Sequence, residues 1–196
     1  PGMARTQVTF EAEPVSRATF VPRGDGAFWF TRDTGGNENF QFYRTDRDGK
    51  VTLVSDGTSR HGALVPSDDG ARIAFNSNKR NGKDFDVWTS DGKDPASAKL
   101  LIEVKGQWSP LAFSPDGKSL LAQEFLSIED QRLHLIDLAS GTAKALTTAK
   151  GAYRDALFSK DGKRLFVTTD KDGDFVELQS LELATGTWQR MTSDVK

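Results

Sequence analysis

The sequence predicts an all-β fold made of repeated four-stranded antiparallel sheets, and three observations support this prediction. An Asp-Gly turn recurs at intervals of 44, 47 and 45 residues, with its aspartates at Asp25, Asp69, Asp116 and Asp161. A second turn, ending in glycine, follows each of these positions by 22 to 24 residues. Two turn signals therefore stay in phase over four copies, which is typical of an internal repeat. No segment combines a sustained 3.6-residue period with helix caps, so little helix is expected.

Each repeat is expected to form four short strands. The run after each Asp-Gly turn, such as Leu120–Ala122, is apolar at consecutive positions, which predicts a strand covered on both faces. The next run, such as Leu133–Ile136, alternates more and suits a strand nearer the rim. Asp-Gly and Ser-Gly pairs supply the positive φ of tight hairpin turns. A period of ~40–45 residues with four strands is the spacing of a β-propeller blade, and it favours a propeller over a sandwich or a solenoid.

The repeats divide the chain into four blades, expected at residues 18–61, 62–108, 109–153 and 154–196. Residues 1–17 are expected to hold a vector-derived junction, Pro1–Gly2–Met3, and then the outer strand of a preceding blade, Gln7–Phe10. Four blades would then carry five outer strands, which predicts an incomplete arc of a larger, seven- or eight-bladed propeller. An open arc exposes two blade faces, so self-association of the isolated arc through these faces is expected.

Composition narrows the function classes. The chain has 196 residues, a formal net charge of −2 and 36% hydrophobic residues. This balance suits a turn-rich globular protein and gives no support to a nucleic-acid binder. The absence of cysteine excludes disulfides, thiolate metal sites and a cysteine nucleophile. No apolar stretch approaches the roughly 20 residues of a membrane span, so no membrane partner is expected. The compartment is left open, with the cytoplasm slightly favoured over the periplasm.

The residues of common catalytic and cofactor sites are missing. No Gly-x-Ser-x-Gly elbow is present, and the nearest segment, Gly57–His61, ends in histidine. His134 falls inside a strand, where a packed or half-exposed imidazole is expected, and His61 is expected to be a solvated loop residue. Two histidines without cysteine make a zinc site improbable. Residues 170–174 alternate carboxylates but lack the final ligand of a calcium loop. No phosphate-binding loop is found either. Taken together, these observations predict that the chain is not an enzyme and that it binds neither a cofactor nor a metal ion.

Several motifs carry a resemblance to known families. The Phe-Ser-Pro-Asp-Gly-Lys turn at residues 113–118 resembles the TolB-like propeller repeat. Three further segments, 33–44, 55–60 and 77–86, are similar to the Asp-x-Gly-Gly-Asn-Glu-x-x-Gln-x-Tyr-Arg, Thr-Asp-Gly-x-Ser-Arg and Ser-x-x-Arg-Asn-Gly-x-Asp-x-Asp stretches of bacterial prolyl oligopeptidase family serine peptidases. The chain departs from that pattern at Val65–Pro66 and at His61, positions that concern packing.

The resemblance implies a propeller that covers an α/β-hydrolase domain, absent from this chain, and limits the access of peptides to it. That domain and peptide substrates are therefore the expected partners. Five residues between the second and third strands of the first two blades are candidates for binding substrate or that domain: Arg32, Asn37, Glu38, Lys79 and Arg80. The alternative, which we favour for these residues, is structural. Asn37 would make local turn hydrogen bonds, and Glu38 and Arg80 would form an inter-blade salt bridge.

Three functions remain open. The favoured one is the non-catalytic propeller domain, or part of it, of a prolyl-oligopeptidase-like serine peptidase. The second is a TolB-like propeller that binds other proteins through one face of the ring. The third, an enzyme with its site at the central channel, ranks lowest because the expected inner strands are apolar and carry few ligand residues.

Overall fold

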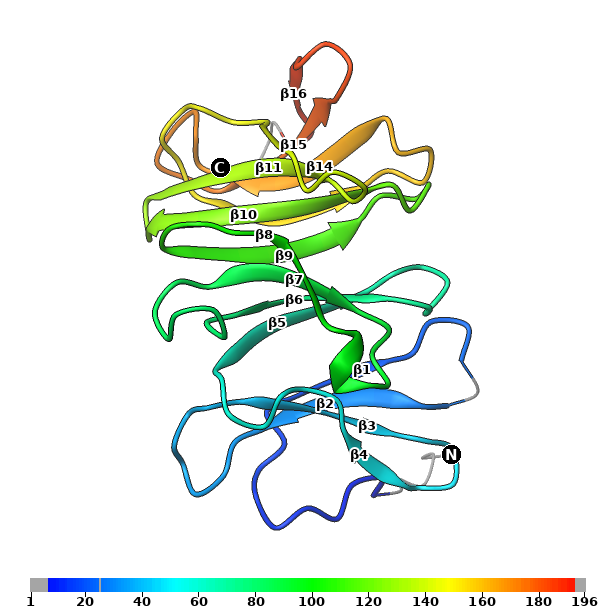
Figure 1. Ribbon diagram of the computed structural model, residues 1–196. Coiled ribbons are helices and arrows are strands. Elements are labelled where there is room, and N and C mark those ends of the chain that lie inside the picture. The colour runs from blue at the N-terminus through cyan, green and yellow to red at the C-terminus, as the bar shows by residue number, and fades with distance from the viewer. Residues whose placement is uncertain (1–6, 25, 193–196) are drawn as a thin grey trace, which may run out of the picture.

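The computed structural model describes residues 7–24 and 26–192, which form four antiparallel sheets of four strands each (Figure 1). The first two sheets contain β1 (Arg17–Phe20), β2 (Phe28–Arg32), β3 (Gln41–Thr45), β4 (Val51–Leu53), β5 (His61–Pro66), β6 (Ile73–Ser77), β7 (Asp86–Ser90) and β8 (Lys99–Ile102). The last two contain β9 (Gln107–Phe113), β10 (Ser119–Ser127), β11 (Asp130–Asp137), β12 (Ala143–Ala145), β13 (Tyr153–Phe158), β14 (Arg164–Thr169), β15 (Glu177–Glu182) and β16 (Trp188–Arg190). Within the described residues the one helical element is a single 3₁₀ turn, Pro95–Ser97.

Strand order follows the sequence within every sheet, and neighbouring strands are antiparallel. The sheets are stacked face to face in chain order, with the first and fourth at opposite ends (Figure 1). Extensive contacts join β9 to β5 and to β13. Between the fourth strands of neighbouring sheets, the described residues show no contact of that extent. The second, third and fourth sheets therefore converge on their first strands, which is the arrangement of propeller blades around an axis.

The predicted fold class is confirmed, with small differences in detail. Each sheet begins one or two residues before the expected blade boundary, at Arg17, His61, Gln107 and Tyr153. Gln7–Phe10 was expected to be a strand, but the structure assigns it none. A strand needs a neighbour for its backbone hydrogen bonds, and among residues 7–24 and 26–192 no strand pairs with this segment. Pro1–Gly2–Met3 and Asp25 lie outside the described residues.

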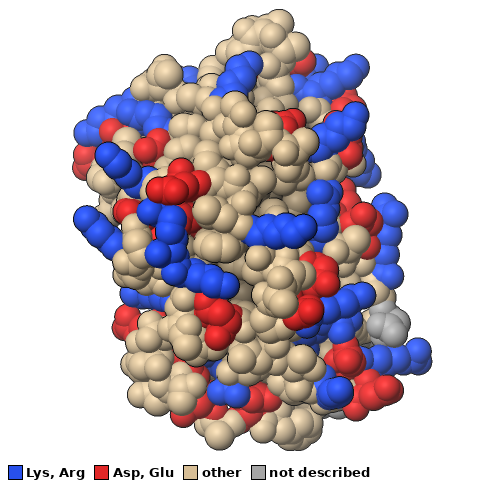
Figure 2. All heavy atoms as spheres, viewed as in Figure 1, with Lys and Arg blue, Asp and Glu red and all other residues tan. Residues whose placement is uncertain are grey.

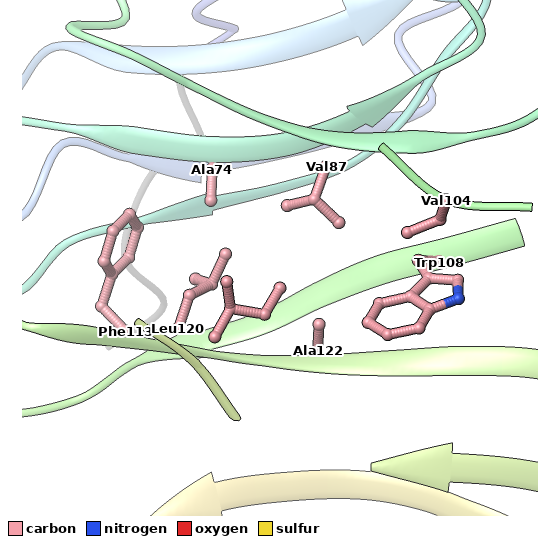
Figure 3. Close-up of a cluster of buried hydrophobic side chains, with 8 residues drawn as sticks. Ala74, Val87, Val104, Trp108, Phe113, Leu120 and Ala122 are labelled. Atoms are coloured by element: carbon pink, nitrogen blue, oxygen red, sulfur yellow. The ribbon is translucent and has the colours of Figure 1, made fainter. Parts of the chain in front are cut away.

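The hydrophobic core is divided among the three interfaces between sheets. Trp29 and Phe42 of the first sheet pack with Ile73 and Phe75 of the second. The middle core joins Ala74 and Val87 to side chains of the third sheet, toward which they point in Figure 3. The third core contains Leu121, Leu133, Tyr153, Ala156, Leu165, Val167 and Leu181. Successive residues of one strand therefore serve different interfaces, since Leu120 and Ala122 belong to the middle core and Leu121 to the third. This explains the continuous apolar runs.

The outer face of the first sheet is less open than an arc would suggest. Phe28 and Phe30 alternate with Trp29 and so lie on the face away from the second sheet, yet they are 7% and 1% exposed. The residues before β1 run along this end of the stack (Figure 1) and are tied to it by the Glu11–Arg32 ion pair, 3.0 Å long. The backbone N–H of Gly35 also donates to Glu13, at 3.2 Å. This segment thus occupies the place where the sequence predicted a preceding blade.

Three of the predicted Asp-Gly turns have one shared hydrogen-bond pattern. In the third sheet, the Ser114 hydroxyl donates to Asp116 at 2.6 Å and accepts from the backbone N–H of Ser119 at 2.9 Å. Gly117 has φ +67° and donates its N–H to the carbonyl of Ser114. Ser67–Gly70 and Ser159–Gly162 repeat these contacts. In each turn the serine hydrogen bond, together with backbone N–H donors, holds the aspartate pKa below its ordinary value. The serine of each of these repeats thus organises its turn.

Replacing Ser114 with alanine is expected to lower the free energy of unfolding by about 1 kcal/mol. The substitution removes the hydroxyl that bridges Asp116 and the Ser119 N–H, and leaves both without this partner. Urea denaturation at pH 7 measures the change. Thr148→Ala is the control, because Thr148 is exposed and its hydroxyl makes no hydrogen bond within the described residues. Equal stability of the two variants would contradict the role assigned to Ser114.

Candidate functional site

The candidate residues lie on the face of the stack formed by the connections between second and third strands. These connections, with the segments that join successive sheets, are on the left in Figure 1, and the Ser-x-Asp-Gly turns are on the right. Of the five predicted residues, Asn37 and Glu38 come from the β2–β3 connection, and Lys79 and Arg80 from the β6–β7 connection. Arg32 was expected on the first of these loops but is the last residue of β2, because it pairs with Gln41 of β3.

The three candidates of the first sheet have local partners. Arg32 pairs with Glu11 and lies over the Tyr43 ring, 4.2 Å from its centroid. The side-chain oxygen of Asn37 accepts from the N–H of Asn39 at 2.9 Å, which is the expected turn hydrogen bond. Glu38 has φ +58°, unusual for a residue with a side chain, and its carboxylate lies 3.5 Å from the Arg60 guanidinium. The Glu38 side chain remains 70% exposed.

The Arg80 side chain forms its hydrogen bonds within its own sheet. Its Nε and Nη2 donate to the two carboxylate oxygens of Asp86 at 2.7 and 3.0 Å, and Nη2 also donates to the carbonyl of Val104 at 2.9 Å. Asp86 is fully buried. The predicted Glu38–Arg80 bridge is therefore wrong, because Arg80 points into its own sheet. Lys79 differs in that its ammonium lies 5.4 Å from the centroid of the Trp88 ring.

The three peptidase-like segments form one hydrogen-bonded unit. Gln41, from the first segment, donates to the Ser59 carbonyl at 2.7 Å and accepts from the Ser55 hydroxyl at 2.7 Å, both in the second segment. Arg60 then links the second segment to the third, since its N–H donates to Asn78 at 2.9 Å. Segments about 20 residues apart in the sequence are thus joined on one face. This explains why these polar residues occur together.

His61 is buried, which corrects the expectation of a solvated loop residue. It is the first residue of β5, is 3% exposed and lies between the rings of Phe42 and Phe75, at 5.2 and 5.7 Å. Nδ1 lies 3.0 Å from the Ser59 carbonyl. Burial lowers the His61 pKa below 6.5, and the nearby Asp56 carboxylate only partly opposes this. The imidazole is therefore a neutral packing group near pH 7.

Stability is expected to fall as the pH decreases below about 6.5, because of His61. Its folded-state pKa is depressed, so the unfolded chain binds a proton that the folded chain does not. One such proton gives a slope of at most about 1.4 kcal/mol per pH unit. Urea denaturation from pH 7.5 to 5 measures this slope. His61→Asn should flatten it, whereas His134→Gln, which keeps His61, should not. Identical slopes for His61→Asn and the unmodified chain would contradict the assignment.

A trough runs along the first strands, between the first and second sheets. β1 and β5 lack the extensive contact that joins β5 to β9, and the space beside them is hollow. Its part near the candidate loops has a volume of about 520 Å³ and is lined by Arg17, Arg60, Phe40, Phe85, Asn76 and Ser109, among others. A second part of about 280 Å³ continues it and is lined by Leu64, Val65, Pro110 and Leu111 with Trp29 and Phe30. The part near the candidate loops is the more polar end of the trough and the second part is the more apolar end, and Arg17 lines both.

Among residues 7–24 and 26–192, no group of three or more metal-ligating side chains comes together. In this same part of the chain no helix could span a membrane. His134 is mostly buried, as expected, with Nε2 2.9 Å from the Glu124 carboxylate and its ring 4.1 Å from that of Trp108. On the side shown in Figure 2, basic and acidic side chains are interspersed.

Comparisons by sequence identify no relative: no protein-family profile matches the chain, and no curated protein does. Comparison of structures, in contrast, finds many β-propellers. TolB from Acinetobacter baumannii superposes with a TM-score of 0.70 at 18% identity, over 94% of this chain and 45% of that one. A puromycin-hydrolyzing peptidase from Mycobacterium tuberculosis gives 0.69 at 16% identity, over 93% and 32%. Oligogalacturonate lyase in complex with manganese gives 0.70 at 13% identity, over 95% and 55%.

The fold and these comparisons define the chain as a run of four β-propeller blades. Its structural neighbours include TolB-like propellers and peptidases of the prolyl oligopeptidase family, the two groups that its motifs resemble. The chain spans 45% and 64% of two TolB structures and about a third of the peptidases, so it matches only part of each. At these identities the likeness establishes the fold alone.

Sequence reasoning did not find the trough. Arg17 and Ser109 belong to no motif, and Arg60 was noted only as the last residue of one. They come together because β1, the residue before β5 and the strand β9 border the same hollow. No motif in the sequence points to this juxtaposition.

Proposed function

We propose that the chain is a non-catalytic propeller domain, or part of one, of a prolyl-oligopeptidase-like serine peptidase, where it controls the access of peptides to an α/β-hydrolase domain. The main support is the hydrogen-bonded unit built from the three peptidase-like segments, centred on Gln41 and Arg60, at one end of the axial trough. A gate requires a fixed rim around a passage, and these bonds fix the loops that form this rim.

Few side chains of the rim are available to act in catalysis. Arg80 is held by Asp86, His61 is buried and neutral, and Asn37 is used within its own turn. Glu38 and Arg60 remain accessible, with side chains 70% and 46% exposed. This set suits binding of peptides or of a neighbouring domain, which we take to be the partners.

A TolB-like propeller that binds proteins is the second candidate. It is supported by the superposition on TolB, which is as good as that on the peptidases. It is also supported by large exposed apolar side chains on the same loop face, Phe125, Leu126 and Ile128 of the β10–β11 hairpin and Phe175 of the β14–β15 connection. Exposed apolar side chains on this face would suit an interaction surface in either protein.

The reading frame of the gene separates the two candidates. A Gly-x-Ser-x-Gly segment downstream of residue 196 supports the peptidase, and a stop codon supports the binding propeller. The present chain should hydrolyse neither peptide p-nitroanilides nor esters. Turnover that a serine-directed inhibitor abolishes would contradict the non-catalytic role, provided that an equally purified unrelated propeller shows none.

A further inference from the structure

We propose that the axial trough binds the C-terminal end of a peptide, with its carboxylate at Arg17 and Arg60 and an apolar last side chain in the adjoining hollow. This proposal rests on the proposed function only in taking peptides as the ligand class. It adds which end of the peptide binds, and which residues recognise it.

The charges at the polar end of the trough favour an anion. Arg17 and Arg60 both line this end, and Arg17 has no carboxylate within ion-pair distance among the described residues. Arg60 has one weak partner, Glu38 at 3.5 Å, and its side chain is 46% exposed. A guanidinium binds a carboxylate through charge-assisted, often bidentate hydrogen bonds, so two of them beside one groove form a suitable receptor.

The rest of the trough favours a peptide over a simple fatty acid. The part of the trough that holds the arginines is also lined by polar groups, including Gln107 and Ser109, which can pair with peptide N–H and carbonyl groups. The apolar part, lined by Leu64, Val65 and Leu111, has a volume of about 280 Å³, room for one aliphatic side chain. An alkyl chain would leave the polar groups without partners, at a cost in affinity.

One carboxylate opposes this arrangement, and it provides a test. Glu38 competes with a ligand for Arg60 and repels an incoming anion. Replacing Glu38 with glutamine should therefore tighten binding, whereas replacing either arginine should weaken it. If Glu38, Arg17 and Arg60 had only structural roles, the glutamate and arginine variants would not change the affinity for the peptide in opposite directions.

The experiment is a calorimetric titration of the chain with N-acetyl-Ala-Leu as the free acid, at low salt. The C-terminal amide of this peptide and octanoate are the comparison ligands. We expect the acid to bind at least about 10-fold more tightly than the amide, and Arg60→Gln and Arg17→Gln each to weaken the acid by about 10-fold. Arg47→Gln is the matched control, since Arg47 is an exposed arginine in the β3–β4 turn on the opposite face.

Several outcomes would overturn the proposal. These are equal affinities for acid and amide, arginine variants that behave like Arg47→Gln, tighter binding of octanoate than of the peptide, or weaker binding by Glu38→Gln. Circular dichroism of each variant confirms that it is folded. The proposed function fails separately: a stop codon directly after residue 196 would remove the peptidase role and leave this titration unchanged.

Discussion

Asp86→Ala is expected to lower the free energy of unfolding by about 3 kcal/mol, more than any other single side-chain truncation on the candidate face. Asp86 is fully buried and accepts from Arg80 twice and from the backbone N–H of Val104 at 2.9 Å. The truncation removes the closest carboxylate partner of the partly buried Arg80 guanidinium, which keeps only Asp84 at 3.5 Å and Glu103 at 3.1 Å, and it leaves a buried N–H without an acceptor. Urea denaturation at pH 7 measures the loss.

Two variants make this test specific. Asp155→Ala removes an exposed carboxylate from β13 whose oxygens make no hydrogen bond within the described residues, so it should change stability by under about 0.5 kcal/mol. Asp86→Asn keeps an acceptor for Val104, so it should cost less than the alanine variant. If Asp86→Ala and Asp155→Ala were equally stable, the connection to Arg80 would not hold this sheet together.

Gly141→Ala is expected to destabilise the chain by about 2–3 kcal/mol, because it pushes two sheets apart. Gly141 has φ +71°, and a Cβ added there would lie 2.4 Å from the Leu101 carbonyl oxygen of the second sheet. A backbone atom cannot swing away as the end of a side chain can. The sheets must therefore separate, or the β11–β12 turn must change its conformation.

Gly186→Ala is the matched control for this prediction. Gly186 ends the corresponding turn of the fourth sheet, also has φ +71°, and has no atom within 4 Å of an added Cβ. Both variants carry the cost of a positive φ, so the difference between them reports the contact between sheets. Urea denaturation of both at one pH gives that difference. Equal losses would show that the close approach to Leu101 contributes nothing.

The repeat architecture could be predicted because its signals are local. Each turn needs a residue that accepts positive φ, and glycine meets this need at Gly70, Gly117 and Gly162, with φ of +68°, +67° and +69°. The consecutive apolar residues of the inner strands predicted that both faces of these strands are buried. Leu120 and Leu121, which belong to different cores, confirm this prediction. The extended N-terminal segment was misjudged, because its Val8–Phe10 run fits a strand and only a neighbouring sheet can make it one.

The candidate site could be predicted only in part. The motifs placed Asn37, Glu38, Lys79 and Arg80 on adjacent loops, and Asn37 makes the turn hydrogen bond that its position suggested. The partner of Arg80 and the environment of His61 were wrong or missing. Both depend on contacts that sequence spacing does not encode: Asp86 faces Arg80 within the second sheet, and His61 enters the first interface between Phe42 and Phe75.

The sequence by itself determined the strands, their turns and their order, because a hairpin forms from residues that are close along the chain. It also determined which strands are covered on both faces. The tertiary structure decided the pairing of charges, the burial of His61 and the trough between Arg17 and Arg60. These features arise at the interfaces between sheets. Which side chains face each other there depends on how whole blades pack against each other.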